Sequence, residues 1–242
     1  MITGGSRGIG RAIADRYAED RAHLILTYLQ NEEAALLAKK ELEQQGASSV
    51  EIQAVDVRNE DASRELVNAI RERYGHLDVL VNNAASGAFR ALHELKLRHW
   101  NFTQDTCVKG PLWLSLQARP LLAKVKGSIV NISSLGSSKV IPNYGPIGVA
   151  KAALESLTRY MAVEMATDGI RVNAVSGGVV ETTALDTYPD REQLFEKART
   201  STPAGRAVHP RDIAHAVYFL TSPAAEMIRG HVLIVDGGYS LT

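Results

Sequence analysis

The chain has 242 residues of ordinary globular composition, 45% hydrophobic and 22% charged. Lysine plus arginine and aspartate plus glutamate both number 27, so no net charge attracts nucleic acid or a membrane surface, and we expect neither as a partner. A single cysteine, Cys107, excludes a disulfide framework. The sequence shows no signal-peptide pattern and no apolar run of spanning length, which predicts a cytoplasmic protein. The seven histidines lack metal-ligand spacing, so we predict no metal site.

Short apolar runs alternate with longer amphipathic segments along the chain. The runs predict strands at His23–Tyr28, Ser49–Val55, Val79–Val81, Ser128–Ile132, Ile170–Val175 and His231–Val235. Apolar residues at helical spacing predict helices at Ile9–Asp20, Glu32–Gln45, Asp61–Tyr74, Leu92–Lys124 and Gly148–Ala166. Most strands are almost continuously apolar, as in parallel sheets covered on both faces. We therefore predict one α/β domain over residues 1–242, a Rossmann-type doubly wound parallel sheet of about seven strands with helices on both faces.

Two segments depart from this alternation. Residues 180–210 are rich in threonine, proline and charge and show no strand signal, so we predict a substrate-binding loop or lid there. At the other end, Met1 and Ile2 are almost all that precedes a glycine-rich turn. If a strand leads into that turn, we expect it to have lost its first half.

The glycine-rich turn reads Thr3-Gly4-Gly5-Ser6-Arg7-Gly8-Ile9-Gly10 and opens the first predicted helix. Glycines at such a place allow a tight turn and let a bound pyrophosphate approach the backbone. The unpaired N–H groups of the helix N-terminus then face the phosphates. The alternative is a glycine-rich loop that binds nothing.

Five further motifs follow in order. They are Asp56-Val57, Asn82-Asn83-Ala84-Ala85, Ser133-Ser134 before a Tyr…Lys helix, Asn173…Gly177-Gly178, and Asp236-Gly237-Gly238. Together with the turn they resemble the short-chain dehydrogenase/reductase family over essentially the whole chain. The resemblance implies a nicotinamide dinucleotide held by Gly4, Ser6, Arg7, Gly8, Ile9, Gly10, Gln30, Asn31, Asp56, Val57, Asn82, Asn83, Ala84, Lys151, Gly177 and Gly178.

The end of the second strand indicates which nicotinamide is bound. Members that prefer NAD carry an acid there for the ribose 2′-hydroxyl, whereas this chain has Thr27-Tyr28, and Glu32 already belongs to the helix. Arg7 is placed to meet a 2′-phosphate by charge-assisted hydrogen bonds, so NADPH is favoured. Gln30 and Asn31 stand where many NADPH-dependent members add a second basic residue, which leaves the affinity resting on Arg7.

The tyrosine of the last motif is displaced. Most family members carry Tyr-x3-Lys with a serine thirteen residues before the tyrosine; counted from Ser134 that place is Ile147, four residues before Lys151. Isoleucine has no proton to give, and Tyr144 lies three residues upstream. Seven residues of helix turn through about 700°, close to two full turns, so Tyr144 and Lys151 can share a face. Asn143 and Pro146 predict that this helix starts near Tyr144.

Conjugate reduction gives this displacement a chemical reason. Hydride added to the β-carbon of an enoyl thioester leaves charge on the thioester oxygen, two carbons away, where a shifted phenol can stabilise it. The stretches around Tyr144, Thr202-Pro-Ala-Gly-Arg206 and Met227-Ile-Arg-Gly230 resemble the NADPH-dependent type III enoyl-acyl-carrier-protein reductases. The resemblance implies Tyr144, Lys151 and Ser134 as catalytic residues. Lys151 would hold ribose hydroxyls and favour phenolate character in Tyr144. Ser134 would hydrogen-bond the substrate or merely end its strand.

Two residues depart from the family pattern. Cys107 replaces an asparagine that supports a proton-relay water in many members, so we expect that relay to be absent or rebuilt, with the thiol packed as a small hydrophobe. Gly177 replaces a proline, which should loosen the turn beside the nicotinamide.

The resemblance also implies partners. We expect an acyl thioester carried on acyl-carrier protein, and a homotetramer formed through the long central helices and the C-terminal region. Candidate contacts to an acidic carrier are Arg90, Lys139, Arg191, Lys197, Arg199 and Arg206. The alternatives are an NADPH-dependent carbonyl, 3-ketoacyl or quinone reductase of the same family, and a non-catalytic NADPH-binding scaffold.

Overall fold

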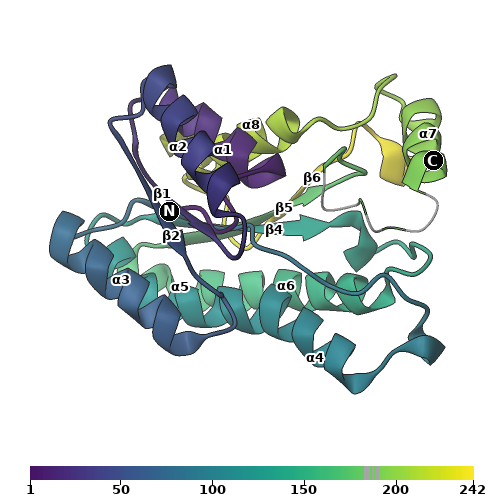
Figure 1. The fold of residues 1–242 in the computed structure, drawn as a ribbon, viewed down its shortest axis with the longest axis horizontal. Helices are drawn as coiled ribbons and strands as arrows, with labels where there is room; N and C mark the ends of the chain where they lie inside the picture. Colours follow the sequence, from purple (N-terminus) through teal and green to yellow (C-terminus); the bar gives the residue numbers. More distant parts are fainter. Residues whose placement is uncertain (183–185, 187, 189–190) are drawn as a thin grey trace.

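The computed structural model describes residues 1–182, 186, 188 and 191–242 (Figure 1). Every strand pairing is parallel. Within the described residues there are six strands rather than about seven, namely β1 (His23–Tyr28), β2 (Ser49–Ala54), β3 (Val79–Asn82), β4 (Ser128–Ser134), β5 (Arg171–Gly177) and β6 (Val232–Val235). The predicted α/β fold is confirmed, and its strand count is one lower.

The segment Met1–Thr3 lies where the missing strand belongs, between β1 and β3. Ile2 bridges in parallel to Leu26 on one side and to Val81 on the other. The Ile2 amide donates a hydrogen bond to the Ile25 carbonyl at 2.8 Å. The spatial order is therefore β2, β1, Met1–Thr3, β3, β4, β5, β6. From Met1–Thr3 the following strands are added first on one side, as β1 and β2, and then on the other, as β3 to β6. Doubly wound sheets bind ligands in the crevice at the carboxyl ends of the strands where this change of side occurs.

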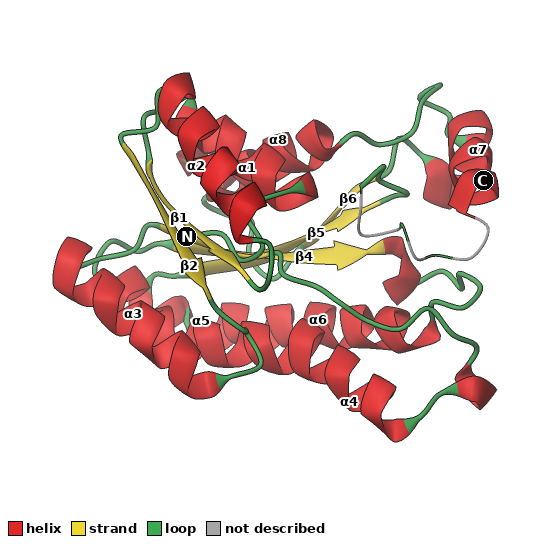
Figure 2. Ribbon diagram, in the orientation of Figure 1, coloured by secondary structure: helices red, strands yellow, loops and turns green. Residues whose placement is uncertain are grey.

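Helices cover both faces of the sheet, as predicted (Figures 1 and 2). One face carries α1 (Gly8–Ala18), α2 (Glu32–Gln45) and α8 (Pro210–Thr221). The other carries α3 (Glu60–Tyr74), α4 (Leu97–Gln104), α5 (Gly110–Ala123) and α6 (Gly145–Glu164), while α7 (Arg191–Ser201) lies beyond the sheet near the C-terminus. Each face has its own apolar core, one around Ile13 and Val217 and the other around Leu66 and Leu121. No described helix is both long and apolar enough to cross a bilayer.

The sequence predictions need correction at three helices. Helix α7 lies within the segment 180–210 that was predicted as a loop or lid. The single helix predicted over Leu92–Lys124 starts only at Leu97, after a 3₁₀ turn at Leu92–Glu94, and a π-helical turn at Asp105–Lys109 separates α4 from α5. Helix α8 was not predicted because its cap is unusual. The His209 side chain accepts from the Arg211 amide, and the Asp212 carboxylate accepts from the His209 amide in return. Histidine is not among the preferred N-cap residues that mark a helix start.

Candidate active site

The glycine-rich turn is tied to the end of β3. The Thr3 hydroxyl accepts hydrogen bonds from the amides of Asn83 and Ala84, both at 2.9 Å. The Asn83 side chain donates to the carbonyls of Thr3 at 2.8 Å and Gly4 at 3.0 Å. These bonds join two predicted motifs that lie eighty residues apart in the chain, and they fix the floor of the crevice.

The turn fits a dinucleotide pyrophosphate. Gly4 and Gly8 adopt positive φ of 63° and 57°, which L side chains rarely adopt. A Cβ atom on Gly10 would strike the Gly4 carbonyl oxygen, so only glycine lets α1 start this close to the turn. Arg7, the residue before α1, makes no side-chain cap, so the first N–H groups of the helix stay open toward the crevice. Open amides at a positive helix end are what an anion binds.

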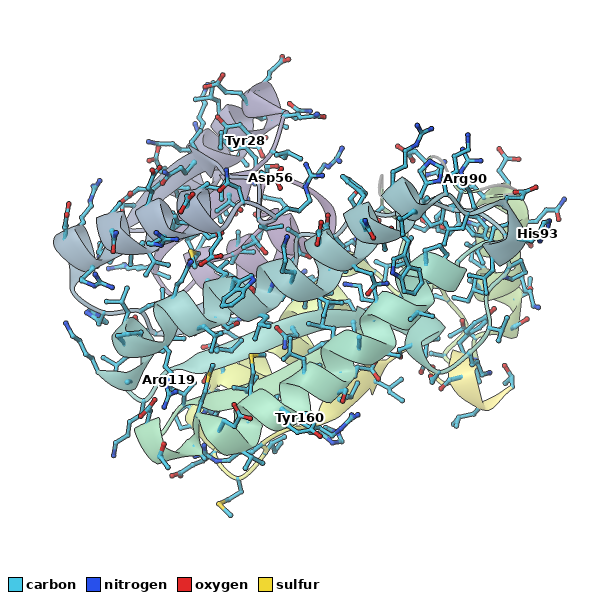
Figure 3. All side chains as sticks on the ribbon, turned by 90° about the horizontal axis from the view of Figure 1, so that it is seen from below. Tyr28, Asp56, Arg90, His93, Arg119 and Tyr160 are labelled. Atoms are coloured by element: carbon cyan, nitrogen blue, oxygen red, sulfur yellow. The ribbon has the colours of Figure 1, made fainter. Side chains whose placement is uncertain are left out.

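Expected contacts to the adenosine half follow β1 and β2, which pair along their length. Figure 3 labels Tyr28, the last residue of β1, and Asp56, which comes after β2. Asp56 follows β2, and the Arg58 guanidinium bonds both of its carboxylate oxygens and holds its pKa below the usual range. Asn31 accepts from the Ala34 amide at 2.8 Å and so caps α2. Gln30 is exposed. The sequence analysis did not predict the ion pair between Arg58 and Asp56. The spacing could have indicated it, because an arginine two residues after an aspartate can reach its carboxylate.

Arg7 is exposed at the mouth of the turn. Within the described part of the chain its guanidinium makes neither a hydrogen bond nor an ion pair, so the charge is open to a ligand.

The Asn82 side chain belongs to a buried hydrogen-bond network. Its amide donates to Asn131 at 2.8 Å and to Ser115 at 3.1 Å. Asn131 in turn donates to the Thr158 hydroxyl at 2.8 Å. This buried network joins β3 and β4 to α5 and α6. The cofactor-binding role of Asn82 stays a prediction, and the bonds of its side chain leave its backbone as the part to meet a cofactor.

Tyr144, Ser134 and Lys151 come together at the end of β4. Tyr144 is the residue before α6, and its hydroxyl donates to Ser134 Oγ at 3.2 Å. Lys151 is buried, and its ammonium donates to the Ile132 carbonyl at 2.7 Å. Since Ile132 and Ser134 are two residues apart on one strand, the side chains of Tyr144 and Lys151 reach the same strand end.

Ile147, at the usual tyrosine position, belongs to the core. It is buried, and a Cβ atom added at Gly87 would lie 2.5 Å from its Cγ1. The place that a tyrosine would fill in the ordinary register is therefore packed with aliphatic side chain against backbone. Tyr144 is the phenol that reaches Ser134.

The Tyr144 ring is held between a backbone and another ring. A Cβ atom on Gly136 would lie 2.5 Å from its Cδ1 and Cε1, and the Phe89 ring lies 5.9 Å away between centroids. Burial raises the pKa of Tyr144 to about 12, against the opposing effect of the Ser134 hydrogen bond. The predicted phenolate character is therefore wrong, because burial disfavours the charged form and the Lys151 ammonium is directed to Ile132. Tyr144 is a neutral hydrogen-bond donor.

Ser134 both ends its strand and takes part in the site. Its Oγ accepts from Tyr144 and, at 3.2 Å, from the Gly136 amide. With both bonds accepted, its own proton stays available for a ligand in the adjoining pocket.

A pocket of about 850 Å³ opens beside Tyr144. Its walls come from Ser134 and Leu135, from Lys139–Tyr144, from Gly178 and Val179, and from α7 and the C-terminal end of the chain. The segment 180–210 contributes Tyr188, Gln193, Leu194, Lys197 and Ser201 to the lining. Six residues of that predicted lid, 183–185, 187 and 189–190, lie outside the described residues.

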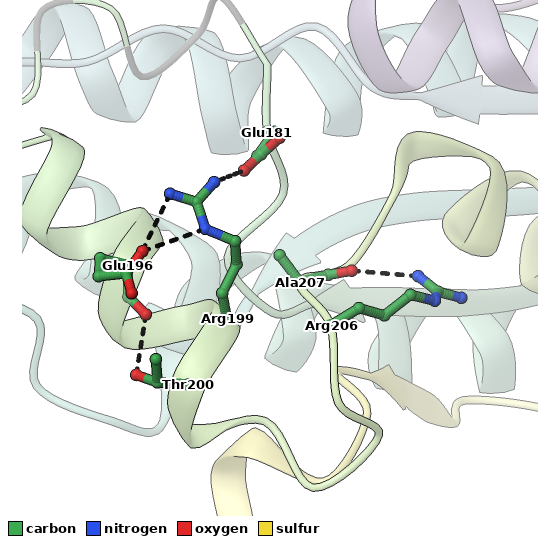
Figure 4. A network of polar contacts seen from close by, with 6 residues as sticks. All are labelled: Glu181, Glu196, Arg199, Thr200, Arg206 and Ala207. Carbon is green, nitrogen blue, oxygen red and sulfur yellow. Dashed lines mark hydrogen bonds and ion pairs between the residues drawn. The ribbon is translucent and has the colours of Figure 1, made fainter.

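Most of the basic residues proposed as carrier contacts already have a polar partner within the protein. Arg199 pairs with Glu181 and Glu196 (Figure 4). Arg206 pairs with Asp212, and Arg191 with Asp186. Lys139 donates to the carbonyls of Tyr239 and Thr242. Only Lys197, on the pocket wall, and the exposed Arg90 make no ion pair or hydrogen bond within the described part of the chain.

The two departures from the family pattern are both buried. Cys107 lies in the π-helical turn, and its thiol donates to the Ser86 carbonyl at 3.5 Å, as expected of a packed thiol. Gly177 is the last residue of β5 and pairs with Ser134 on one side and Val235 on the other. The two ladders hold the Gly177 backbone in the sheet, and the loosening of the turn beside the nicotinamide stays a prediction. No three acidic, histidine or cysteine side chains among the described residues cluster as a metal site.

Comparison with known proteins agrees with this geometry. The family model described as "Enoyl-(Acyl carrier protein) reductase" matches residues 4–240. The chain is 35% identical to "1-cyclohexenylcarbonyl-CoA reductase" of Streptomyces collinus, over 100% of this chain and 86% of the relative. It is 34% identical to the 3-oxoacyl-[acyl-carrier-protein] reductase FabG of Staphylococcus aureus, over 98% of this chain and 96% of the relative.

Among solved structures, a putative short-chain alcohol dehydrogenase of Sinorhizobium meliloti aligns with a TM-score of 0.92 at 33% identity, covering 100% of this chain and 95% of that one. The chain belongs to the short-chain dehydrogenase/reductase family and is a nicotinamide-dependent oxidoreductase.

Proposed function

We propose that the protein reduces the trans-2 double bond of enoyl thioesters with NADPH, as an enoyl-acyl-carrier-protein reductase of fatty-acid elongation. The observation that carries this proposal is the position of the phenol. Tyr144 bonds Ser134 from just before α6, while Ile147 fills the ordinary tyrosine position with aliphatic packing. The match to the enoyl reductase model and the likeness to a 1-cyclohexenylcarbonyl-CoA reductase support it, because that name describes an unsaturated thioester.

Each residue then has a defined task. NADPH, when bound, would supply the hydride for the β-carbon, and solvent would supply the proton that completes the α-carbon. The Tyr144 phenol, protonated because burial raises its pKa, would turn its proton from Ser134 to the thioester oxygen as negative charge develops there. Ser134 retains its own proton, which it would donate to Tyr144 in exchange or to the same thioester oxygen. The Lys151 ammonium donates one hydrogen bond to the Ile132 carbonyl, which leaves two protons to bind the ribose hydroxyls.

NADPH is proposed over NADH on the strength of Arg7. Its unpaired guanidinium stands at the turn that fits the pyrophosphate, and β1 ends in Tyr28 without an acid. A 2′-phosphate would give that charge a partner.

The substrate's carrier and the assembly are also proposals. Of the candidate carrier contacts, Lys197 and Arg90 are without an ion pair or hydrogen bond among the described residues and would meet an acidic acyl-carrier protein. Apolar side chains that stand exposed on the central helices and near the C-terminus support a homotetramer, among them Trp113, Val149, Tyr160, Val163, Met227 and Leu241.

A 3-oxoacyl reductase is the second candidate, since a relative of equal similarity carries that name. Reduction of a ketone needs the acid beside the carbon that receives hydride, and there this chain has Ile147. The assembled Tyr144, Ser134 and Lys151 argue against a scaffold without catalysis.

The deciding experiment compares NADPH oxidation with crotonyl thioester and with acetoacetyl thioester. We expect turnover with the crotonyl compound, and a loss on the order of 10²- to 10³-fold in Tyr144→Phe, the usual cost of one oxyanion donor. Tyr74→Phe, which removes a hydroxyl that bonds Glu51 at the end of α3, is the matched control. Turnover restricted to the keto compound would overturn enoyl reduction, and turnover with neither would favour the scaffold.

A further inference from the structure

A second tyrosine contacts the loop that carries Tyr144. Tyr188 is buried, lines the same pocket, and comes from the segment between β5 and α7. Its hydroxyl donates a hydrogen bond to the Pro142 carbonyl at 3.0 Å. Pro142 lies two residues before Tyr144, so this bond connects the segment after β5 directly to the loop before α6.

The same tyrosine supports the Tyr144 ring through Phe89. The Tyr188 and Phe89 rings meet edge to face at 85°, with centroids 5.3 Å apart. Phe89 lies 5.9 Å from Tyr144, on whose ring Gly136 also packs. Edge-to-face pairs are directional contacts, so Tyr188 constrains where Phe89 lies and Phe89 constrains the phenol.

The loop before α6 contains a residue with a left-handed backbone, and such a residue needs neighbours that hold it in place. Asn143, between Pro142 and Tyr144, has φ of 57°, in the left-handed region. A turn closed by the Tyr144 amide and the Ile141 carbonyl at 3.1 Å contains this residue. Left-handed residues other than glycine persist where neighbours hold them, and asparagine does so most readily. The Tyr188 hydroxyl bonds the carbonyl next to this residue.

We propose that Tyr188 is a positioning residue for Tyr144: its hydroxyl fixes the Pro142–Tyr144 turn, and its ring, through Phe89, sets where the phenol meets the substrate oxygen. Tyr188 need not touch the reacting atoms. The inference rests on the role of Tyr144 given above and adds the residue that holds it.

Tyr188→Phe tests this proposal, since it removes the hydroxyl and keeps the ring against Phe89. We expect kcat with crotonyl thioester to fall about tenfold, because small misplacements of a catalytic group are costly, while the KM for NADPH stays within about twofold. The solvent deuterium isotope effect on kcat should rise, because the step stabilised by the exchangeable Tyr144 hydroxyl becomes more rate-limiting. A residue that only stabilised the fold would not change that isotope effect.

A double-mutant cycle with Tyr144→Phe completes the test. If Tyr188 acts through Tyr144, adding Tyr188→Phe to Tyr144→Phe costs less than about twofold, because no phenol is left to position. Independent, multiplying losses would overturn the proposal, as would a Tyr188→Phe enzyme with wild-type kcat and isotope effect. Tyr74→Phe serves again as control. Wild-type activity in Tyr144→Phe would instead refute the proposed function, so the two failures are distinguishable.

Discussion

At the scale of single residues, the chemistry depends on the protonation state of one phenol. Tyr144 sits against Phe89 and Gly136, and burial raises its pKa to about 12. A protonated phenol donates to a developing enolate oxygen, whereas a phenolate would repel it. The environment of Tyr144 therefore suits stabilisation of negative charge on the substrate.

This pKa predicts the alkaline pH dependence. The folded value lies above the ordinary value of about 10, so the neutral phenol contributes stability below pH about 10 and loses it as pH rises through about 12. We expect kcat/KM to show no alkaline limb from Tyr144 below pH about 10. Tyrosinate absorbance of the free enzyme, wild type against Tyr144→Phe, measures the ionisation directly. A limb near neutral pH that coincides with a Tyr144-dependent absorbance change would contradict it.

Arg7 carries the second prediction at this scale. Removing its open guanidinium in Arg7→Ala should raise the KM for NADPH about 10- to 100-fold, the worth of charge-assisted hydrogen bonds to a phosphate. The KM for NADH should change by less than about twofold, because NADH has no 2′-phosphate. Arg64→Ala, an exposed arginine on α3 that pairs with Glu60 and Asp61, is the control. Equal effects on both cofactors would remove the argument for NADPH.

At the scale of elements, the site depends on how closely the turn after β4 approaches α6. A Cβ atom on Gly136 would meet the Tyr144 ring, and one on Gly148 would lie 2.5 Å from the Gly136 carbonyl oxygen. The absence of side chains at these two glycines therefore lets the Leu135–Ser137 turn pack against the start of α6. The same packing places the Tyr144 ring beside Ser134.

Gly136→Ala tests this packing. The added methyl group must displace the Tyr144 ring, so kcat should fall tenfold or more, since misplacement of a catalytic group is costly. NADPH binding, measured by fluorescence titration, should be little changed because the glycine-rich turn is remote in the chain. Ser137→Ala, the next residue of the same turn, adds no bulk and is the control. An unaltered kcat in Gly136→Ala would show that the ring tolerates displacement.

At the scale of the whole molecule, the surface retains apolar side chains that a monomer does not need. Val163 is 76% exposed and Tyr160 67% exposed on α6, and Trp113 and Leu116 are partly exposed on α5. Large exposed apolar patches on soluble proteins mark interaction sites. A homotetramer that pairs these helices would cover them.

We therefore predict that light scattering of the purified protein gives four times the chain mass of 26.3 kDa. Val163→Glu should shift the protein to a smaller species, because burying an unpaired carboxylate in an apolar interface is costly. Leu36→Glu, at an equally apolar residue exposed to 54% on α2, should leave the assembly intact. A monomer in the wild type would contradict the prediction.

Much of this molecule could be predicted from sequence, because the patterns involved are local. Apolar runs located the strands, glycine spacing located the turn, and the offset of Tyr144 from Ile147 indicated the displaced phenol. Helix α8 was missed because its histidine cap is rare. The break between α4 and α5 was missed because a π-helical turn leaves the chain helical on both sides of it.

The sequence by itself determined the α/β fold and the place of the glycine-rich turn, since periodicity and spacing are properties of the chain. Its resemblance to a known family predicted Tyr144, Lys151 and Ser134 as site residues. Only the tertiary structure decided the charge state of Tyr144, because burial and the direction of the Lys151 ammonium depend on packing. Packing also brought Phe89, Gly136 and Tyr188 to the phenol from separate parts of the chain. No local pattern records those contacts, because they arise where distant segments meet at the end of one strand.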